Sequence, residues 1–213
     1  MLEFALIAMS LTLMTLGTGV FGANMIKVQQ TSQLAMEAGQ LFAAGLDLSQ
    51  PGNQTILTTI GSDLGLSSTS GQGNAVVILS ALTYVDQATC AAAGEVDSNG
   101  NPTSGCTNYG NWVFTMHLTI GNSSVRTSNV GSPLTTGPAS VTIGSDGSIP
   151  LSEYATQAGD VAQFNGVNPY SDIGGVVSGL PSGKFVYIAE AAANSFQMFP
   201  WSNVGATYAF GIF

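Results

Sequence analysis

The sequence of 213 residues has little charge, and positive charge is the scarcest. Charged residues make up 7% of the chain, against about 25% in typical soluble domains, and only Lys27, Arg126 and Lys184 are basic. The formal net charge at neutral pH is −9. Because nucleic-acid binding needs basic residues that displace counterions from phosphates, this deficit excludes DNA and RNA as partners and disfavours docking on anionic lipid.

The chain also lacks the residue groupings that catalysis and cofactor binding require. His117 is the single histidine and falls in a strand-like run, where we expect a hydrogen-bonded structural role rather than acid–base duty. Glu153 with Asp160, or Asp172 with Glu190, could be imagined as glycosidase pairs, but nothing in their spacing supports that chemistry. No phosphate-binding loop, zinc-protease helix or nucleophile elbow occurs. We therefore expect neither enzyme activity nor a cofactor.

Cysteine is equally scarce. Cys90 and Cys106 are the only two, and they flank a loop rich in Ala, Gly, Ser and Asn. In an exported protein such a pair predicts a disulfide, which would stabilise the fold by about 3 kcal/mol for a loop of this length. Two free thiols in a cytosolic protein are the alternative. Zinc is disfavoured, because two thiols without a nearby histidine do not complete a tetrahedral site.

The loop between the cysteines matches the first half of a calcium-binding loop. Oxygen-bearing side chains recur there at alternate positions, namely Glu95, Asp97, Asn99 and Asn101. Gly100 stands sixth, as such a loop requires, but Cys106 occupies the twelfth position, where a bidentate glutamate belongs. A turn at the tip of a disulfide-closed loop explains the same residues. The sequence favours the turn over the calcium site.

What the chain does have is a long apolar run at its beginning. Residues 4–26 carry no charge, and residues 4–23 hold only hydroxyl residues and three glycines among the apolar ones. A run of about 20 residues matches the hydrocarbon thickness of a bilayer. A secretory signal explains it poorly, since neither a cationic start nor a cleavage site frames it, and we expect that a basic leader once preceded Met1. The run predicts a helix that spans a membrane or lies in an equally dry protein assembly.

The helical pattern continues past Lys27 as an amphipathic segment. Its apolar stripe consists of Leu34, Ala35, Ala38, Leu41, Phe42, Gly45 and Leu46. Polar residues hold the opposite face, so one helix is predicted from Met1 to about Leu46, ended by Pro51 and Gly52. We divide the chain into a helical segment, residues 1–48, and a head, residues 49–213.

The two ends of the chain carry a distinctive pattern, which consists of Glu3-Phe4-Ala5-Leu6-Ile7 with its apolar run, Gly-Val-Phe-Gly at 19–22, and 180–190 followed by Phe199-Pro200. The resemblance that these residues carry is to TadE/TadG-type pilins of tight-adherence systems and, more broadly, to processed type IV pilins. It implies a helix held in the inner membrane before assembly and then extracted into a filament of identical subunits outside the cell. In the family the acid usually stands fifth rather than third, and it pairs with the N-terminal amine of a neighbouring subunit.

Six residues of the apolar run are the expected assembly residues: Glu3, Phe4, Gly17, Gly19, Gly22 and Ala23. A buried charge pair costs several kcal/mol to break on one side, so Glu3 would fix the axial register of each subunit. The alternative is a carboxylate favoured by the helix dipole at a membrane surface. Each glycine is about 1 kcal/mol worse than alanine inside a helix. We expect the glycines to allow close helix packing, with Gly19 and Ala23 as a small-residue pair, while unwinding during extraction is the alternative.

The rest of the chain predicts a β-rich head, which makes the fold class α+β. Strand-like runs occupy 75–85, 112–120, 140–143 and 184–188, a tight turn is expected at 144–148, and short helices near 151–164 and 172–180. Asn53 and Asn122 lie in glycosylation sequons, which indicate at most exposed loops. We expect core or intersubunit contacts from the C-terminal aromatics, namely Phe196, Phe199, Trp201, Tyr208, Phe210 and Phe213.

Two functions fit these features. The first is a structural subunit that polymerises through its N-terminal helix into an extracellular filament for surface attachment. The second is a monomeric, membrane-anchored binding domain outside the cytoplasm. A filament would bury both the apolar half and the amphipathic stripe between identical subunits, whereas an anchor needs only the first half. The continuous helix therefore favours the filament.

Overall fold

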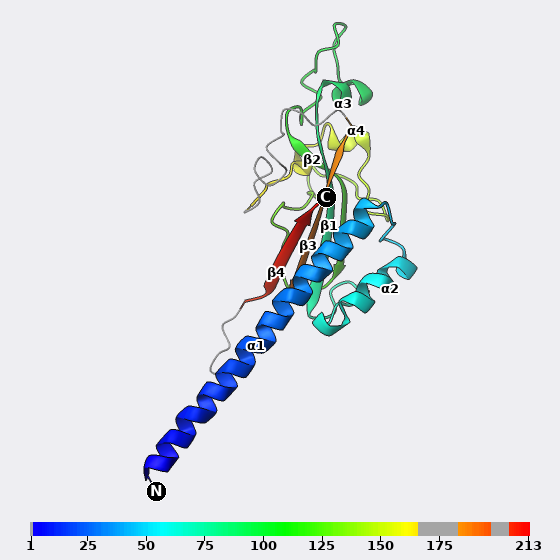
Figure 1. Cartoon of the computed structure of the whole chain (residues 1–213). Coiled ribbons are helices and arrows are strands. Elements are labelled where there is room, and N and C mark those ends of the chain that lie inside the picture. The colour runs from blue at the N-terminus through cyan, green and yellow to red at the C-terminus, as the bar shows by residue number, and fades with distance from the viewer. Residues whose placement is uncertain (1, 166–182, 197–204) are drawn as a thin grey trace.

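The computed structural model describes residues 2–165, 183–196 and 205–213, with the side chains of the first helix described from Ile7 onward. A long helix, α1 (Leu2–Ala43), projects from a head built on a four-stranded antiparallel sheet (Figure 1). The predicted α+β class is confirmed. The second half of α1 packs on the sheet, so the head includes part of this helix.

Helix α1 ends slightly earlier than the sequence suggested because Gly45 adopts a left-handed conformation with φ +83°. The N–H of Leu46 then donates to the carbonyl of Leu41 at 3.1 Å, and that of Gly45 donates to Phe42 at 2.9 Å. This pair of bonds closes the helix as a Schellman motif, a conformation that glycine adopts without steric cost.

Pro51 was expected to end the first helix, but it begins a second one, α2 (Pro51–Ile60), which was not predicted. Proline has a fixed φ and no N–H, so it suits the first turn of a helix, where that N–H has no intrahelical partner. Leu57 is the buried residue of α2, and a short 3₁₀ turn, η1 (Ser62–Leu64), follows. Together they cover the end of the sheet beside α1.

The sheet has the strand order β2-β1-β3-β4. Strands β1 (Ala75–Tyr84) and β2 (Trp112–Gly121) match predicted runs. Strand β3 (Phe185–Ala193) continues beyond the end predicted for it at residue 188, and β4 (Thr207–Ile212) was not predicted. β1 is buried along nearly its whole length, as its continuous apolar run requires. The predicted strand at 140–143 is wrong: Val141 donates to the carbonyl of Leu134, but this segment joins no ladder of the sheet.

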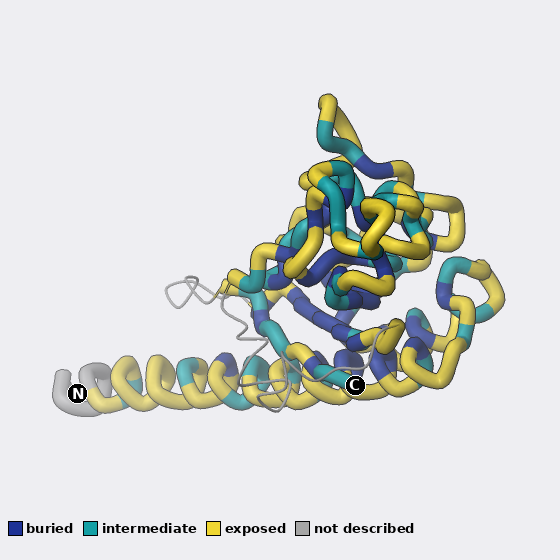
Figure 2. Tube along the Cα trace, turned by 90° about the horizontal axis from the view of Figure 1, so that it is seen from above, coloured by how far each residue is buried: buried dark blue, intermediate teal, exposed yellow. Residues whose placement is uncertain are grey.

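Two apolar layers flank the sheet (Figure 2). The layer under α1 contains Leu34, Ala38 and Phe42 from the helix with Leu79 and Ala189 from the strands. The opposite layer is formed by the loops that cross the other face, including the predicted turn, where Gly147 N–H donates to the Gly144 carbonyl at 2.9 Å. It contains Phe114, Trp112, Val130, Val141, Ile149 and Ile188.

The end of the head farthest from the N-terminus carries the disulfide (Figure 1). Cys90 lies in α3 (Gln87–Ala92) and is joined to Cys106, with a Cα–Cα distance of 5.7 Å, so the predicted pairing is confirmed. The disulfide packs near two short elements, α4 (Leu151–Tyr154) and a 3₁₀ turn, η2 (Ala158–Asp160). Both lie within the segment where short helices were expected. The second such segment, 172–180, lies outside the described residues.

Candidate assembly helix and its seat on the head

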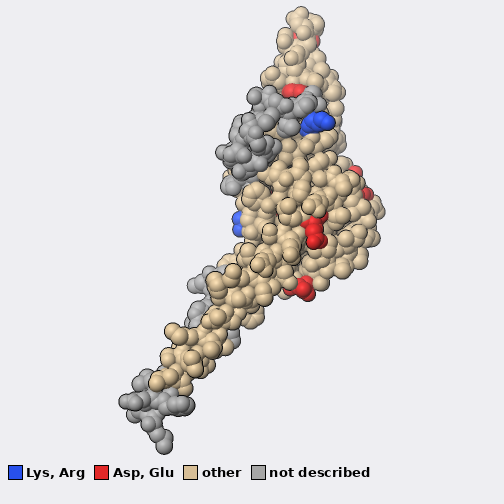
Figure 3. All heavy atoms as spheres, in the orientation of Figure 1, with Lys and Arg blue, Asp and Glu red and all other residues tan. Residues whose placement is uncertain are grey.

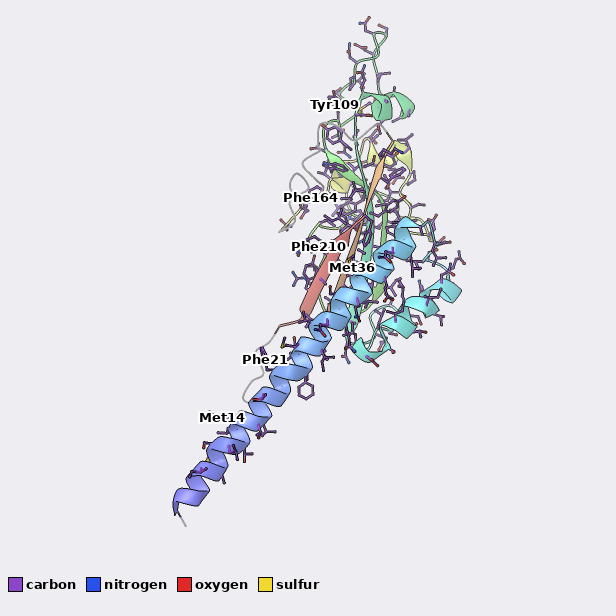
Figure 4. All side chains as sticks on the ribbon, viewed as in Figure 1. Met14, Phe21, Met36, Tyr109, Phe164 and Phe210 are labelled. Carbon is purple, nitrogen blue, oxygen red and sulfur yellow. A yellow bond between two sulfur atoms is a disulfide. The ribbon has the colours of Figure 1, made fainter. Side chains whose placement is uncertain are left out.

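The projecting half of α1 presents apolar side chains on all sides. Exposed fractions reach 73% for Met14 and 67% for Phe21, both labelled in Figure 4. The other exposed large apolar residues of this stretch are Ile7, Met9, Leu11, Leu13, Leu16, Met25, Ile26 and Val28. On the face shown in Figure 3 the described atoms of this half include no charged side chain. By length and composition the helix is long and apolar enough to cross a membrane.

The few polar side chains of this half are satisfied within the helix itself. The hydroxyl of Ser10 donates to the carbonyl of Ile7 at 3.0 Å. Those of Thr12 and Thr18 donate to carbonyls four residues back, both at 2.8 Å. Because an unsatisfied hydroxyl is costly where water is absent, these bonds fit the helix for a dry environment.

Polar contacts mark the level at which α1 meets the head. Asn24 pairs with the main chain of Phe196, accepting from its N–H at 2.8 Å and donating to its carbonyl at 3.3 Å. One turn further along, the ammonium of Lys27 donates to the carbonyl of Asn194 at 2.8 Å. These two residues satisfy backbone groups beyond the end of β3, so the polar boundary of the helix coincides with the base of the head.

On the C-terminal side of this boundary, the amphipathic stripe packs on the sheet of the same chain. Leu34, Ala35, Ala38 and Phe42 are buried against β3 and β4, and Phe42 meets the ring of Tyr187 edge-on at 5.2 Å. This corrects the expectation that the stripe would be buried between identical subunits. The sequence could not show it, because the facing surface is assembled from strands far along the chain.

The contact leaves an apolar groove where α1 emerges from the head. The groove has a volume of about 480 Å³ and lies against Val20, Phe21, Met25 and Val28, with Thr207 of β4 at one edge. A hydrogen bond of 2.8 Å between the hydroxyls of Thr31 and Thr207 fixes the first residue of β4 to the helix. The groove therefore runs along the projecting half of α1 itself and reaches the head at Thr207.

The predicted assembly residues all belong to α1, in different environments. Glu3 and Phe4 lie in its first turns, and their side chains are outside the described set. Around Gly19 and Gly22 there is open space, since a Cβ at either position would meet nothing within 4 Å. Gly17 lines the groove, and Ala23 is half-buried. No contact among the described residues explains why glycine stands at 19 or 22, so a packing role would have to involve another molecule.

A buried carboxylate that the sequence analysis did not single out as a site holds the far side of the sheet together. Glu190 of β3 is 2% exposed and accepts hydrogen bonds from the Ser128 hydroxyl, the Asn129 N–H at 2.8 Å and the Tyr208 hydroxyl at 2.7 Å. Arg126 stacks on the Tyr208 ring at 4.0 Å. Burial, followed by the bond to Glu190, raises the pKa of the Tyr208 phenol. An acid in an otherwise apolar strand was the available signal.

The candidate calcium residues form a turn instead of a cluster. One oxygen of Asp97 accepts the N–H groups of Asn99 and Asn101, both at 2.8 Å, and the bond from Asn101 is the main reason that the pKa of this carboxyl is lowered. Glu95 accepts from the Thr103 hydroxyl at 3.0 Å. In the described part of the chain no group of three His, Cys, Asp or Glu side chains could hold a metal.

The remaining predicted residues have structural partners. His117 lies in β2, as expected, with Nδ1 3.2 Å from the Ser80 hydroxyl, and burial lowers its pKa to about 4. The amides of both sequons are engaged: Asn53 donates to the Asp47 carbonyl at 2.7 Å and Asn122 to the Gly73 carbonyl at 3.0 Å. A glycan on either amide would have to replace such a bond. Phe199 and Trp201 lie outside the described residues.

Comparison with known proteins adds no relative: no family model, no curated protein and no solved structure matches this chain. The function is therefore inferred from α1 and from its packing on the head.

Proposed function

We propose that this protein is a pilin-like structural subunit that polymerises through α1 into an extracellular filament for surface attachment. The observation that supports this most is the division of one helix into two surfaces. Its second half packs on the head, whereas its first half projects over a length that suits a bilayer, uncharged between Glu3 and Lys27 and largely exposed from Ile7 onward.

An apolar surface of this size needs a covering. Large exposed apolar patches on soluble proteins mark interaction sites or membrane contacts. Before assembly, the lipid of the inner membrane covers the projecting half. In the filament, the same half is covered by the helices of identical subunits, and the groove at Phe21 and Met25 is part of the surface that they cover.

The glycines favour the filament over a simple anchor. A lipid-facing helix gains nothing from Gly19 and Gly22, which have open space around them and weaken the helix. Neighbouring helices do gain from them, because small residues let backbones approach closely where water is absent. The monomeric anchored domain remains the second candidate, since the stripe is covered within the chain and only the projecting half is free.

Substitution of Glu3 tests this function. In the resemblance to pilins, Glu3 pairs with the N-terminal amine of a neighbouring subunit, so Glu3→Gln should leave the protein in the membrane and abolish surface fibres. Glu37→Gln is the matched control, because it is the same chemical change at an exposed position on the seated half of α1. The measurement is the amount of the protein in material sheared from cells, compared with the membrane fraction. Normal surface fibre from Glu3→Gln would contradict the proposed role.

A further inference from the structure

A buried acid near the disulfide end has no hydrogen-bond donor. Asp160, at the end of η2, is 0% exposed, and neither of its carboxyl oxygens has a partner among the described residues. The amide oxygen of Asn108 is also buried without a partner among the described residues. A buried ionised carboxylate without a donor is among the most costly groups that a protein interior can hold.

Asn108 and Asp160 are neighbours through a shared carbonyl. The Asn108 side-chain N–H₂ donates to the carbonyl of Gln157 at 2.7 Å and to that of Tyr154 at 2.8 Å. The backbone N–H of Asp160 donates to the same Gln157 carbonyl at 3.1 Å. The Asn108 amide oxygen is thus left without a donor, and its residue shares the Gln157 carbonyl with an acid that, when ionised, can only accept.

One proton resolves both deficits. A protonated carboxylic acid has an O–H that donates, and the amide oxygen of Asn108 accepts. We infer that Asp160 is a neutral acid in the folded head, and that its proton is donated to the Asn108 amide oxygen, directly or through one buried water. Burial, and then the nearby negative charge of Glu153, raise the pKa of Asp160 to about 8, which agrees with this assignment.

No residue that the structure describes gives Asp160 a compensating positive charge. Glu153 and Tyr154 of α4 are the titratable groups that act on it, and burial followed by the charge of Asp160 raises the pKa of Tyr154. The other elements packed on this turn contribute uncharged residues: Val161 bridges Val113, and Gly159 bonds the main chain of Ala139. The proton is therefore the available means of neutralising the site.

The hydrogen bond from the Asp160 carboxyl to the Asn108 amide oxygen joins two segments of the head, and we call this contact the Asp160 latch. Asn108 lies two residues after Cys106, just outside the disulfide-closed loop, and Asp160 belongs to the α4–η2 segment, so the bond joins these two segments. Between the ordinary pKa of 3.8 and about 8, the folded head binds one proton that the unfolded chain has released. Stability from this group is therefore greatest in acid and falls as pH rises through that window.

Between about pH 4 and 6.5, His117 opposes the loss of stability that Asp160 causes as the pH rises. Its pKa is lowered from 6.5 to about 4, so between those values the folded head binds one proton fewer than the unfolded chain. The two groups cancel up to about pH 6.5. From pH 6.5 to 8 only the Asp160 effect remains, and the equilibrium constant for unfolding should rise about tenfold per pH unit, or about thirtyfold in all.

Denaturant unfolding of the full chain in detergent, at several pH values between 5 and 9, tests the latch. Asp160→Asn keeps the shape and supplies a permanent N–H donor, so it should fold and remove the loss of stability between pH 6.5 and 8. Asp146→Asn is the control, because Asp146 is exposed and the Ser148 hydroxyl lowers its pKa, so this change should leave the loss in place.

Measurements on the unaltered protein keep the test decisive if Asp160→Asn does not fold. In protein labelled with ¹³C at the aspartate carboxyls, the resonance of Asp160 should titrate well above that of any exposed aspartate. An Asp160 carboxyl that titrates near 4 would overturn the inference. So would stabilisation by added calcium that disappears in Asp160→Asn, because the carboxylate would then be an ionised cation ligand.

Discussion

Phe213 lies so close to Gly39 that a Cβ on residue 39 would stand 1.9 Å from its Cε2 atom. The end of β4 is thereby packed directly on the backbone of α1. Gly211 is also close to this ring, as a Cβ there would lie 2.8 Å from the same atom. Two small residues thus make room for one aromatic ring, and the ring joins the C-terminal strand to the N-terminal helix.

Gly39→Ala should therefore destabilise the head by about 1–3 kcal/mol through overpacking, although alanine is the better helix former. In a Phe213→Ala background the same change should be neutral or stabilising by up to about 1 kcal/mol, since the clash has gone. Denaturant unfolding of the four proteins gives the coupling. Gly52→Ala, where a Cβ meets nothing within 4 Å, is the control for a glycine change without a clash. Additive effects at 39 and 213 would show that the contact is not formed.

The seat of α1 predicts where the chain can be shortened. A chain that begins at Gln50 loses Leu34, Ala38 and Phe42 and exposes the apolar face of the sheet, so it should aggregate. A chain that begins at Ala23 keeps the stripe and the bonds of Asn24 and Lys27, and it should be a soluble monomer. Light scattering of both after expression in the same host distinguishes them. A soluble, folded monomer starting at Gln50 would contradict the packing described for α1.

The hydrogen bonds to Glu190 should contribute strongly to the stability of the head on the face of the sheet opposite α1. Glu190→Ala leaves the Ser128 hydroxyl, the Asn129 N–H and the Tyr208 hydroxyl without their acceptor, and should cost about 2–4 kcal/mol of unfolding free energy. Glu190→Gln keeps one acceptor oxygen and should cost less. Thermal unfolding ranks the two variants, and an equal loss for both would contradict this, because it would mean that the acceptor oxygen retained by glutamine contributes nothing.

His117 gives the head a second pH dependence, visible once Asp160 is neutral at all pH values. In Asp160→Asn, stability should fall as pH drops from 6.5 towards 4, because the unfolded chain then takes up a proton that the buried imidazole refuses. Adding His117→Gln should flatten this slope. Urea midpoints at pH 4.5, 5.5 and 6.5 make the comparison, and an unchanged slope in the double variant would assign the effect to other groups.

The sequence predicts the elements whose patterns are local. The uncharged run gives α1, a continuous apolar run gives β1, alternation gives β2, and the single pair of cysteines in a chain with an export-type N-terminus gives the disulfide. Helix α3 was missed although Asp86 carries a capping signal, its carboxylate accepting from the Thr89 N–H at 2.8 Å. Strand β4 was missed because glycine and alanine interrupt its aromatic residues.

The candidate site divides in the same way. The exposed half of α1 was predicted from composition, since a helix that is apolar on every side has no single face to hide. The packing of α1 on the head was not predicted, because Ala189, which packs against the stripe, and Phe196, which bonds Asn24, lie more than a hundred residues away and only the tertiary fold brings them together. The Asp160 latch was not predicted either, since burial depends on which loops cover η2.

Electron microscopy of material sheared from cells that produce the full chain tests the central claim most directly, with the protein identified by an antibody against the head. If the protein polymerises through α1, filaments should carry the head along their length. They should be lost when Gly19 is replaced by leucine, because this change leaves membrane insertion intact but prevents close helix packing. Protein that stays in the membrane as a monomer, with no filament in which the antibody finds it, would contradict the account and leave α1 as an anchor.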